Sequence, residues 1–170
     1  MIHVLGSINI DYSVAVSHLP TPGETIAGKS LDLTAGGKGA NQALAARRAG
    51  AEVRMNGAIG TDSVADAAVS LLKSGGVDLS GVKSIPGPTG CAFVFVDEQS
   101  ENQIVIIAGA NGSVSTEQAS EMNISRDDIL LLQLECPLQS VVAAAQHARQ
   151  NGGKTTVSYT HLTLPTTPYV

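Results

Sequence analysis

Short apolar segments alternate with helical segments along this chain, and this alternation constrains its fold more than any other feature. A helical run over 42–49 stops at Gly50, segment 52–56 has the character of a strand, and a second helix is predicted over 63–73. Gly50 suits the left-handed residue that often ends a helix. Helix, strand and helix in quick succession indicate βαβ units and a largely parallel sheet.

Further strands and helices are predicted on both sides of this unit. The apolar runs 2–8 and 128–134 indicate buried strands, and a helix is expected from Pro137 to about Gln150, followed by a strand over 154–157. Segments 89–96 and 103–107 flank a polar turn and predict a β-hairpin inserted into the α/β pattern. Because an isolated hairpin buries little surface, we expect it to pair with 12–33.

Composition narrows the classes of function. The 170 residues suffice for one domain, the net charge is −5, aromatic residues make up 3% and Trp is absent, which disfavours nucleic-acid binding. No apolar stretch is long enough to span a membrane and the first residues do not resemble a signal peptide, so we expect a cytoplasmic protein. Cys91 and Cys136 match no metal-binding spacing and are expected to be reduced core thiols.

A glycine-rich loop precedes the first helix. Residues 35–41 read Ala-Gly-Gly-Lys-Gly-Ala-Asn, so Lys38 brings a mobile positive charge and Asn41 an amide to a backbone that a ligand can approach closely. Backbone N–H groups at the start of the following helix would face a polar ligand. The alternative is a tight turn with a surface lysine.

Polar side chains also follow the apolar runs. Asn9 and Asp11 lie at the end of the first run, and Glu135 follows 128–134. In parallel α/β sheets ligands bind beyond the carboxyl ends of the strands, so these groups and the glycine loop should converge on one cavity beside Lys38. Two carboxylates, amides and an ammonium suit a neutral polyol such as a sugar better than a triphosphate. The alternatives are a turn cap for Asp11 and a first-turn helix charge for Glu135.

Four motifs, in this order, resemble the ribokinase branch of the PfkB-type carbohydrate kinases, and the resemblance extends from Met1 to about Val157. They are Gly6–Asp11, Gly36–Asn41 with Gly50 and Gly60 at their later spacings, Thr89–Ile107 and Leu132–Pro137. The resemblance implies a Rossmann-like three-layer α/β/α sandwich with a small β-sheet lid over the sugar, built from about 12–34 and 88–107. The lid also implies a homodimer contact.

The resemblance further implies ATP-dependent phosphorylation, with Mg²⁺, of a sugar hydroxymethyl group. Ribose converted to ribose 5-phosphate is the expected reaction, and fructose or a nucleoside is the alternative substrate. The sugar-binding residues carried over from the family are Asn9, Asp11, Gly36, Gly37, Lys38, Asn41, Ala92, Val94 and Glu135.

The sequence departs from the family pattern in its second half. The family's Gly-Ala-Gly-Asp motif, with its catalytic base, is not found, nor is a Walker A motif; Ala108–Asn111 is similar only superficially, follows the hairpin too early and offers no base. We therefore expect 1–157 to be an incomplete, truncated kinase domain and 158–170 to be a tail outside the family pattern, similar to translated cloning-vector sequence.

Three readings of such a chain remain open. They are the N-terminal half of a sugar kinase that is inactive by itself, a non-catalytic sugar-binding fragment, and a regulatory half-domain that pairs with a full-length subunit through the lid. We also expect a marginally folded or aggregation-prone polypeptide in which strand 129–134 is exposed.

Overall fold

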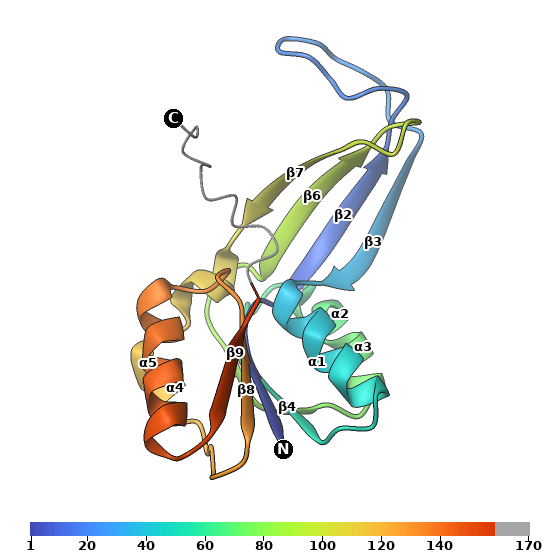
Figure 1. The fold of residues 1–170 in the computed structure, drawn as a ribbon. Coiled ribbons are helices and arrows are strands. Elements are labelled where there is room, and N and C mark those ends of the chain that lie inside the picture. The colour runs from blue at the N-terminus through green and yellow to red at the C-terminus, as the bar shows by residue number, and fades with distance from the viewer. Residues whose placement is uncertain (159–170) are drawn as a thin grey trace, which may run out of the picture.

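The computed structural model describes residues 1–158; the tail from 159 onward lies outside the described residues. Its central element is a parallel sheet in the order β5-β4-β1-β8-β9 (Figure 1). The five strands are β1 (Ile2–Leu5), β4 (Val53–Ile59), β5 (Asp78–Ser84), β8 (Ile129–Leu132) and β9 (Lys154–Val157). Every pairing within this sheet is parallel, which confirms the α/β class predicted from the alternating segments.

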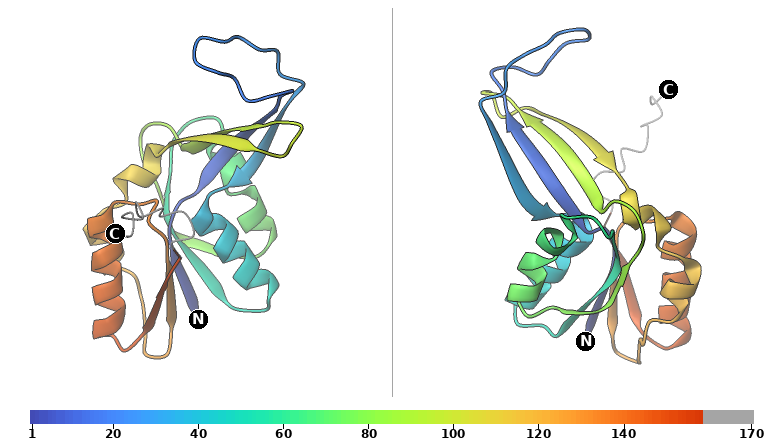
Figure 2. Two further views of the ribbon diagram at one scale, coloured as in Figure 1. Left: turned by 45° about the horizontal axis from the view of Figure 1, so that its top comes forward. Right: turned by 180° about the vertical axis from the view of Figure 1, so that it is seen from behind.

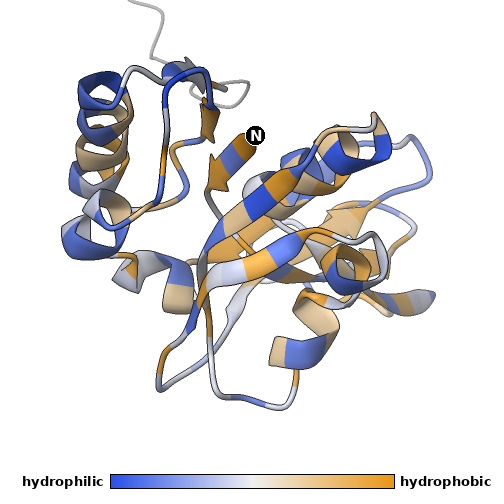
Figure 3. Ribbon diagram, turned by 90° about the horizontal axis from the view of Figure 1, so that it is seen from below, coloured by the Kyte–Doolittle hydropathy of each residue, from blue (hydrophilic) through white to orange (hydrophobic). Residues whose placement is uncertain are grey.

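Helices cover both faces of the parallel sheet and make a three-layer sandwich (Figure 1). One layer contains α1 (Lys38–Arg48), α2 (Ala65–Ala68) and α3 (Ser70–Ser74), and the other contains α4 (Thr116–Ser120) and α5 (Leu138–Gln150). Successive side chains of β1 point to opposite faces of the sheet and so pack against both helix layers. Val4 packs in the core under α1, and its neighbour Leu5 packs in the core under α5. Seen from below, hydrophobic residues concentrate in the strands between the helix layers (Figure 3).

The sequence predicted a single helix over 63–73, but the structure has two short helices there. The predicted helix is interrupted between α2 and α3. It is divided at Val69, whose backbone angles, φ −101° and ψ 1°, leave the helical range between α2 and α3. The Val69 side chain is buried in the core with Leu72, so the break places an apolar side chain in the interior.

A second sheet, which we call the lid sheet, projects from the carboxyl ends of the parallel strands (Figures 1 and 2). Its order is β3-β2-β6-β7. The strands are β2 (Asn9–Ala15), β3 (Ser30–Gly36), β6 (Gly90–Val96) and β7 (Asn102–Ile107). The expected hairpin is β6–β7, and it pairs with the segment after residue 12 as predicted, because β6 lies parallel to β2.

The first strand is shorter than predicted. The run 2–8 was expected to be one strand with Asn9 and Asp11 at its end, but β1 stops at Leu5 and Asn9 begins a new strand in the lid sheet. Ile8 remains fully buried in the core under α1, which explains why the apolar run continues past the end of β1. The chain thus crosses from one sheet to the other at the place where the polar residues begin.

The exposed edge also differs from the expectation. Strand 129–134 was expected to be bare, but β8 is paired on both sides and β9 forms the edge of the sheet.

Within residues 1–158, none of the helices combines the length and apolar character that a membrane crossing requires.

Candidate sugar-binding site

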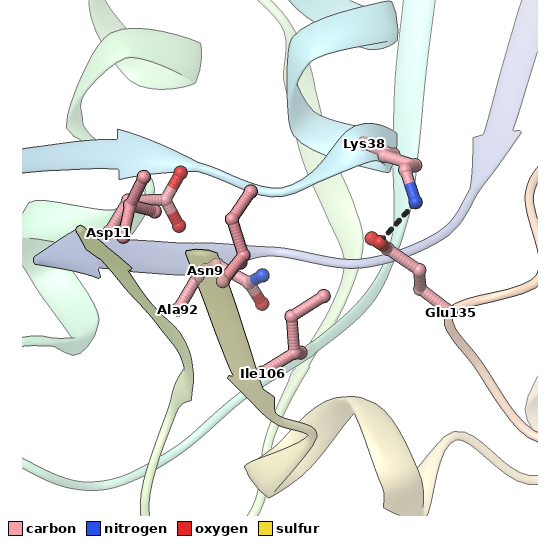
Figure 4. A pocket seen from close by; sticks show the side chains of 8 residues that line it. Asn9, Asp11, Lys38, Ala92, Ile106 and Glu135 are labelled. Atoms are coloured by element: carbon pink, nitrogen blue, oxygen red, sulfur yellow. Dashed lines mark hydrogen bonds and ion pairs between the residues drawn. The ribbon is translucent and has the colours of Figure 1, made fainter. Parts of the chain in front are cut away.

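A cavity of about 310 Å³ lies where the lid sheet meets the carboxyl ends of the parallel strands (Figure 4). Side chains from three strands of the lid sheet, from the start of α1 and from the loop after β8 surround it. The lining residues are Asn9, Asp11, Lys38, Ala92, Val94, Ile104, Ile106 and Glu135. The cavity therefore combines four polar side chains with four apolar ones.

Strand pairing brings the lid residues of the cavity onto one face. Asn9 and Asp11 are two positions apart on β2, so their side chains point to the same side. Asp11 is the register partner of Ala92, and Ala92 is the register partner of Ile106. Val94 pairs with Ile104 in the same way and completes an apolar roof beside the polar residues.

The glycine loop places Lys38 at the opposite wall. Gly37 has a φ of 93°, which strains any residue with a side chain, and a Cβ there would lie 2.7 Å from the carbonyl oxygen of Ser7. Gly37 is the N-cap of α1, so Lys38 is the first helical residue and its side chain leaves the helix start toward the cavity. Gly36, at the end of β3, lies against the carboxylate of Asp11.

Glu135 receives two hydrogen bonds at the cavity wall. Lys38 donates from Nζ to Oε1 at 2.6 Å, and Ser7 donates from Oγ to Oε2 at 2.5 Å. Burial by itself raises the pKa of Glu135, but the hydrogen bonds from Lys38 and Ser7 outweigh burial and hold the pKa below its usual value. Glu135 is consequently ionised at neutral pH and able to accept further hydrogen bonds.

Asp11 has a different environment. Its Oδ1 is buried and makes no hydrogen bond within the part of the chain that the structure describes. Burial, and then repulsion from Glu135, raises the pKa of Asp11. A buried carboxylate oxygen without a partner is costly, and a ligand hydroxyl that donates to it would relieve this cost.

The structure unites most of the site residues expected from the sequence. Asn9, Asp11, Lys38, Ala92, Val94 and Glu135 all line the cavity, while Gly36 and Gly37 shape its backbone. Asn41 is the exception. It lines a separate small pocket of about 10 Å³ with Leu44 and Leu71, and its expected contact with the ligand stays a prediction.

Four contributors were missed by sequence reasoning. Ile104 and Ile106 line the cavity, and the alternation of the second hairpin segment with Ala92 and Val94 could have indicated them. Ser7 and Asn111 do not line the cavity but donate hydrogen bonds to two residues that do, Glu135 and Asn9 respectively. Nothing local in the sequence signals these two contacts, because each joins residues more than 100 positions apart.

The described residues do not offer an evident place for a nucleotide's metal ion. Among residues 1–158, no group of three or more His, Cys, Asp and Glu side chains is arranged to hold a metal. Both thiols are free, and burial raises the pKa of Cys136 to about 12.

A parallel α/β sheet whose carboxyl ends face a β-sheet lid across a polar cavity defines a lidded α/β domain with a cavity of small-molecule size. The model of the pfkB family carbohydrate kinases matches residues 1–166. The chain belongs to this family, whose members are sugar kinases and hence transferases.

Named relatives agree with the family and show how much of it is present. The chain is 43% identical over 154 residues to a ribokinase of Haemophilus influenzae and 41% identical over 158 residues to one of Schizosaccharomyces pombe; the matches cover 89% and 88% of this chain and 50% of each relative. It is also 35% identical to a deoxyribokinase of Salmonella typhi, over 89% of this chain and 50% of that protein. The chain thus spans about half the length of the curated relatives it matches.

Solved structures show the same relationship. The ribokinase of Cryptococcus neoformans in complex with ADP superposes with a TM-score of 0.83 at 36% identity, over 96% of this chain and 52% of that one. The ribokinase of Arabidopsis thaliana complexed with ribose and ATP gives a TM-score of 0.78 at 30% identity, over 92% of this chain and 52% of that one. The fold is therefore that of a ribokinase-like domain over about half its length.

Proposed function

We propose that the cavity binds ribose and that the chain supplies the sugar-binding part of an ATP-dependent kinase that converts ribose to ribose 5-phosphate. The observation that carries this proposal is the convergence of Asn9, Asp11, Lys38 and Glu135 on one cavity beneath the lid sheet. Had Glu135 been remote from Lys38, the proposal would have failed, but the two side chains are in contact.

The chemistry of the cavity suits a pentose. Asp11 and Glu135 are carboxylates that accept hydrogen bonds from hydroxyls, and Lys38 and Asn9 donate to hydroxyl oxygens. The four aliphatic side chains of the roof match the C–H faces of a sugar and exclude water from them. Two carboxylates in one cavity would repel a phosphate group, which favours a neutral sugar there.

Phosphoryl transfer depends on positioning and on stabilising charge at the phosphates. These 170 residues contain no Gly-Ala-Gly-Asp motif and no residue that we assign to ATP or Mg²⁺. We propose that a polypeptide of this sequence binds sugar without phosphorylating it and that the catalytic base, ATP and Mg²⁺ belong to a further part of the kinase. Such a kinase would work in the cytoplasm, where ATP is available.

We also propose that the outer face of the lid sheet forms a homodimer. Tyr12 and Phe93 stack on this face with ring centroids 5.2 Å apart, and their register partners Leu33 and Val105 are 52% and 57% exposed. This row of apolar side chains crosses four strands, with Leu33 and Val105 exposed and Tyr12 and Phe93 half-buried, and a second lid sheet would cover it.

Calorimetric titration tests the sugar. The 170-residue chain should bind ribose with the same affinity in the presence and absence of ATP, and more tightly than fructose or a nucleoside. Binding of fructose or a nucleoside in preference to ribose would reassign the substrate within the family. A coupled assay on the same sample should detect no phosphorylation, and measurable turnover would contradict the assignment of catalysis to another part of the kinase.

A further inference from the structure

Asn111 is a buried residue whose side chain connects the end of the lid sheet to the start of β2. It lies in the 3-10 helix η1 (Gly109–Ser113), which follows β7, and is 2% exposed. Its Oδ1 accepts a hydrogen bond from the Ile8 N–H at 2.9 Å, and its Nδ2 donates to the Ile8 carbonyl at 3.2 Å and to Asn9 Oδ1 at 2.8 Å. Both hydrogens of the Asn111 amide are thus used.

The backbone fixes which way this amide points. A backbone N–H can only donate and a carbonyl can only accept, so the two contacts with Ile8 determine which end of the Asn111 side chain is oxygen and which is nitrogen. The atom of Asn9 that faces Asn111 Nδ2 must in turn be an acceptor, which is its Oδ1. The orientation of the Asn9 amide follows from the backbone of its neighbour.

This arrangement leaves Asn9 Nδ2 for the cavity. Asn9 lines the cavity (Figure 4) although it is only 4% exposed. No hydrogen bond within residues 1–158 uses its Nδ2. The amide pair is also closely enclosed. A Cβ at Gly90 would lie 2.1 Å from Asn111 Nδ2 and 2.5 Å from Asn9 Oδ1, so this position has room only for glycine.

We propose that Asn111 is a positioning residue that makes Asn9 an obligatory hydrogen-bond donor, so that the sugar oxygen at this point must accept. The inference rests on the proposed sugar-binding function. It assigns a role to the Ala108–Asn111 segment that differs from phosphate binding or proton abstraction. Asn111 acts through Asn9 and does not contact the ligand itself.

Reversing the polarity of this contact tests the inference. In Asn111→Asp the carboxylate can still accept from the Ile8 N–H but can no longer donate to Asn9 or to the Ile8 carbonyl. The Asn9 amide should therefore rotate, donate its Nδ2 to the new carboxylate and present its oxygen to the cavity. A ribose hydroxyl can reverse its own role and donate to that oxygen, whereas a fluorine at the same carbon cannot.

The measurement is calorimetry on the 170-residue chain with ribose and its three monofluoro analogues, substituted at carbon 2, 3 or 5. For one analogue, the affinity relative to ribose should fall by about tenfold more in Asn111→Asp than in the unmodified chain, while the other two ratios stay unchanged. The matched control is Asn123→Asp, which adds the same charge at an exposed position and should leave all three ratios unchanged.

Each outcome decides the question. An equal loss for ribose and every analogue in Asn111→Asp would show a purely structural role and overturn the inference alone. If the unmodified chain binds none of these sugars, the proposed function fails as well. Should Asn111→Asp not fold, Asn9→Asp presents an oxygen at the same point with Asn111 in place. It should show the same selective loss, and ratios like those of the unmodified chain would overturn the inference.

Discussion

Gly36 lies directly against Asp11, so that a Cβ on Gly36 would stand 2.0 Å from Oδ2 of the Asp11 carboxylate. The two residues are on adjacent antiparallel strands of the lid sheet, β3 and β2. The absence of a side chain at 36 gives the Asp11 carboxylate its space at the cavity wall. This contact explains the first of the two adjacent glycines in the loop, as the positive φ explains the second.

Gly36→Ala should therefore displace the Asp11 carboxylate and weaken ribose binding by about tenfold, corresponding to roughly one lost hydrogen bond to a charged group. The colliding atom is the end of a side chain that can rotate, so the free energy of unfolding should fall by less than about 1 kcal/mol. Calorimetry and chemical denaturation measure the two effects.

Gly112→Ala is the matched control for this substitution. A Cβ there meets only the Ala108 Cβ, at 3.5 Å, which is an ordinary contact. Its ribose affinity should be unchanged, and an equal loss of affinity in the two variants would argue against the role given to Gly36.

Ribose binding should depend on pH through Asp11. Burial and the neighbouring Glu135 raise the pKa of Asp11 above the ordinary value of 3.8, whereas Glu135 stays ionised to lower pH because its pKa is lowered. If the ionised Asp11 accepts from the sugar, affinity should fall as the pH drops through the raised pKa, by up to about tenfold per pH unit. Asp11→Asn should bind more weakly and lose this dependence, while the exposed Glu98→Gln should keep it.

The same shift has the opposite sign for stability. Because the folded chain holds the Asp11 proton more tightly than the unfolded chain, this residue adds stability below pH 3.8, and the added stability is lost as the pH rises through the raised pKa. A binding curve that falls with acidification while the Asp11 contribution to stability rises would distinguish a functional carboxylate from a structural one. Parallel changes in both would contradict this assignment.

Ser7→Ala should release Glu135 from one of its two donors. The hydrogen bond from Ser7 Oγ holds Glu135 Oε2 at 2.5 Å, so its loss should let the carboxylate move toward Lys38 and lower ribose affinity by about fivefold to tenfold. Calorimetry gives this value. Ser140→Ala is the control, because Ser140 is equally buried and its hydroxyl donates to the Val114 carbonyl at 2.7 Å, away from the cavity. It should cost stability alone, and a similar affinity loss there would refute the positioning role of Ser7.

Several of the elements that the sequence predicted have residues that face a core. The apolar runs of β1, β4 and β8 signal strands because side chains on these strands are buried between the helix layers. In contrast, β5 was not predicted. Its sequence Asp-Leu-Ser-Gly-Val-Lys-Ser has two apolar residues, Leu79 and Val82, and as an edge strand it pairs only with β4. An edge strand of this composition carries too weak a period to be recognised.

The candidate site, like the fold, could be predicted from the sequence only in part. Asn9, Asp11 and Glu135 were identified because polar residues that follow buried strands meet at one edge of a parallel sheet. Asn41 lines a separate pocket in this structure, and its expected contact with the sugar stays a prediction. The contacts of Ser7 and Asn111 depend on how two sheets meet in space, which no local pattern records.

Acid should destabilise the fold through His3. The His3 side chain is 1% exposed and neither ring nitrogen makes a hydrogen bond within residues 1–158, although Asp128 lies 3.6 Å away. Burial lowers the pKa of His3, and the attraction of Asp128 offsets this only in part. Since the unfolded chain binds the proton more readily, the free energy of unfolding should fall as the pH drops below 6.5, by up to about 1.4 kcal/mol per pH unit.

Denaturation between pH 5 and 7 checks this expectation. His3→Gln should flatten the pH dependence in that interval. A pH dependence that survives His3→Gln would assign the effect to another group.

Exposed apolar side chains on α5 should make the 170-residue polypeptide prone to aggregate. Leu138 and Val142 are one turn apart on the same side of this helix and are 67% and 45% exposed, near the open edge at β9. The double substitution Leu138→Glu and Val142→Glu removes both apolar side chains and increases the net negative charge. It should raise the concentration at which light scattering begins by about twofold or more, with little change in the unfolding midpoint.

Because charge alone improves solubility, the control is Gln139→Glu with Gln146→Glu, which adds the same charge to exposed positions of α5 and keeps the apolar pair. Equal onset concentrations for the two double variants would show that Leu138 and Val142 do not drive aggregation.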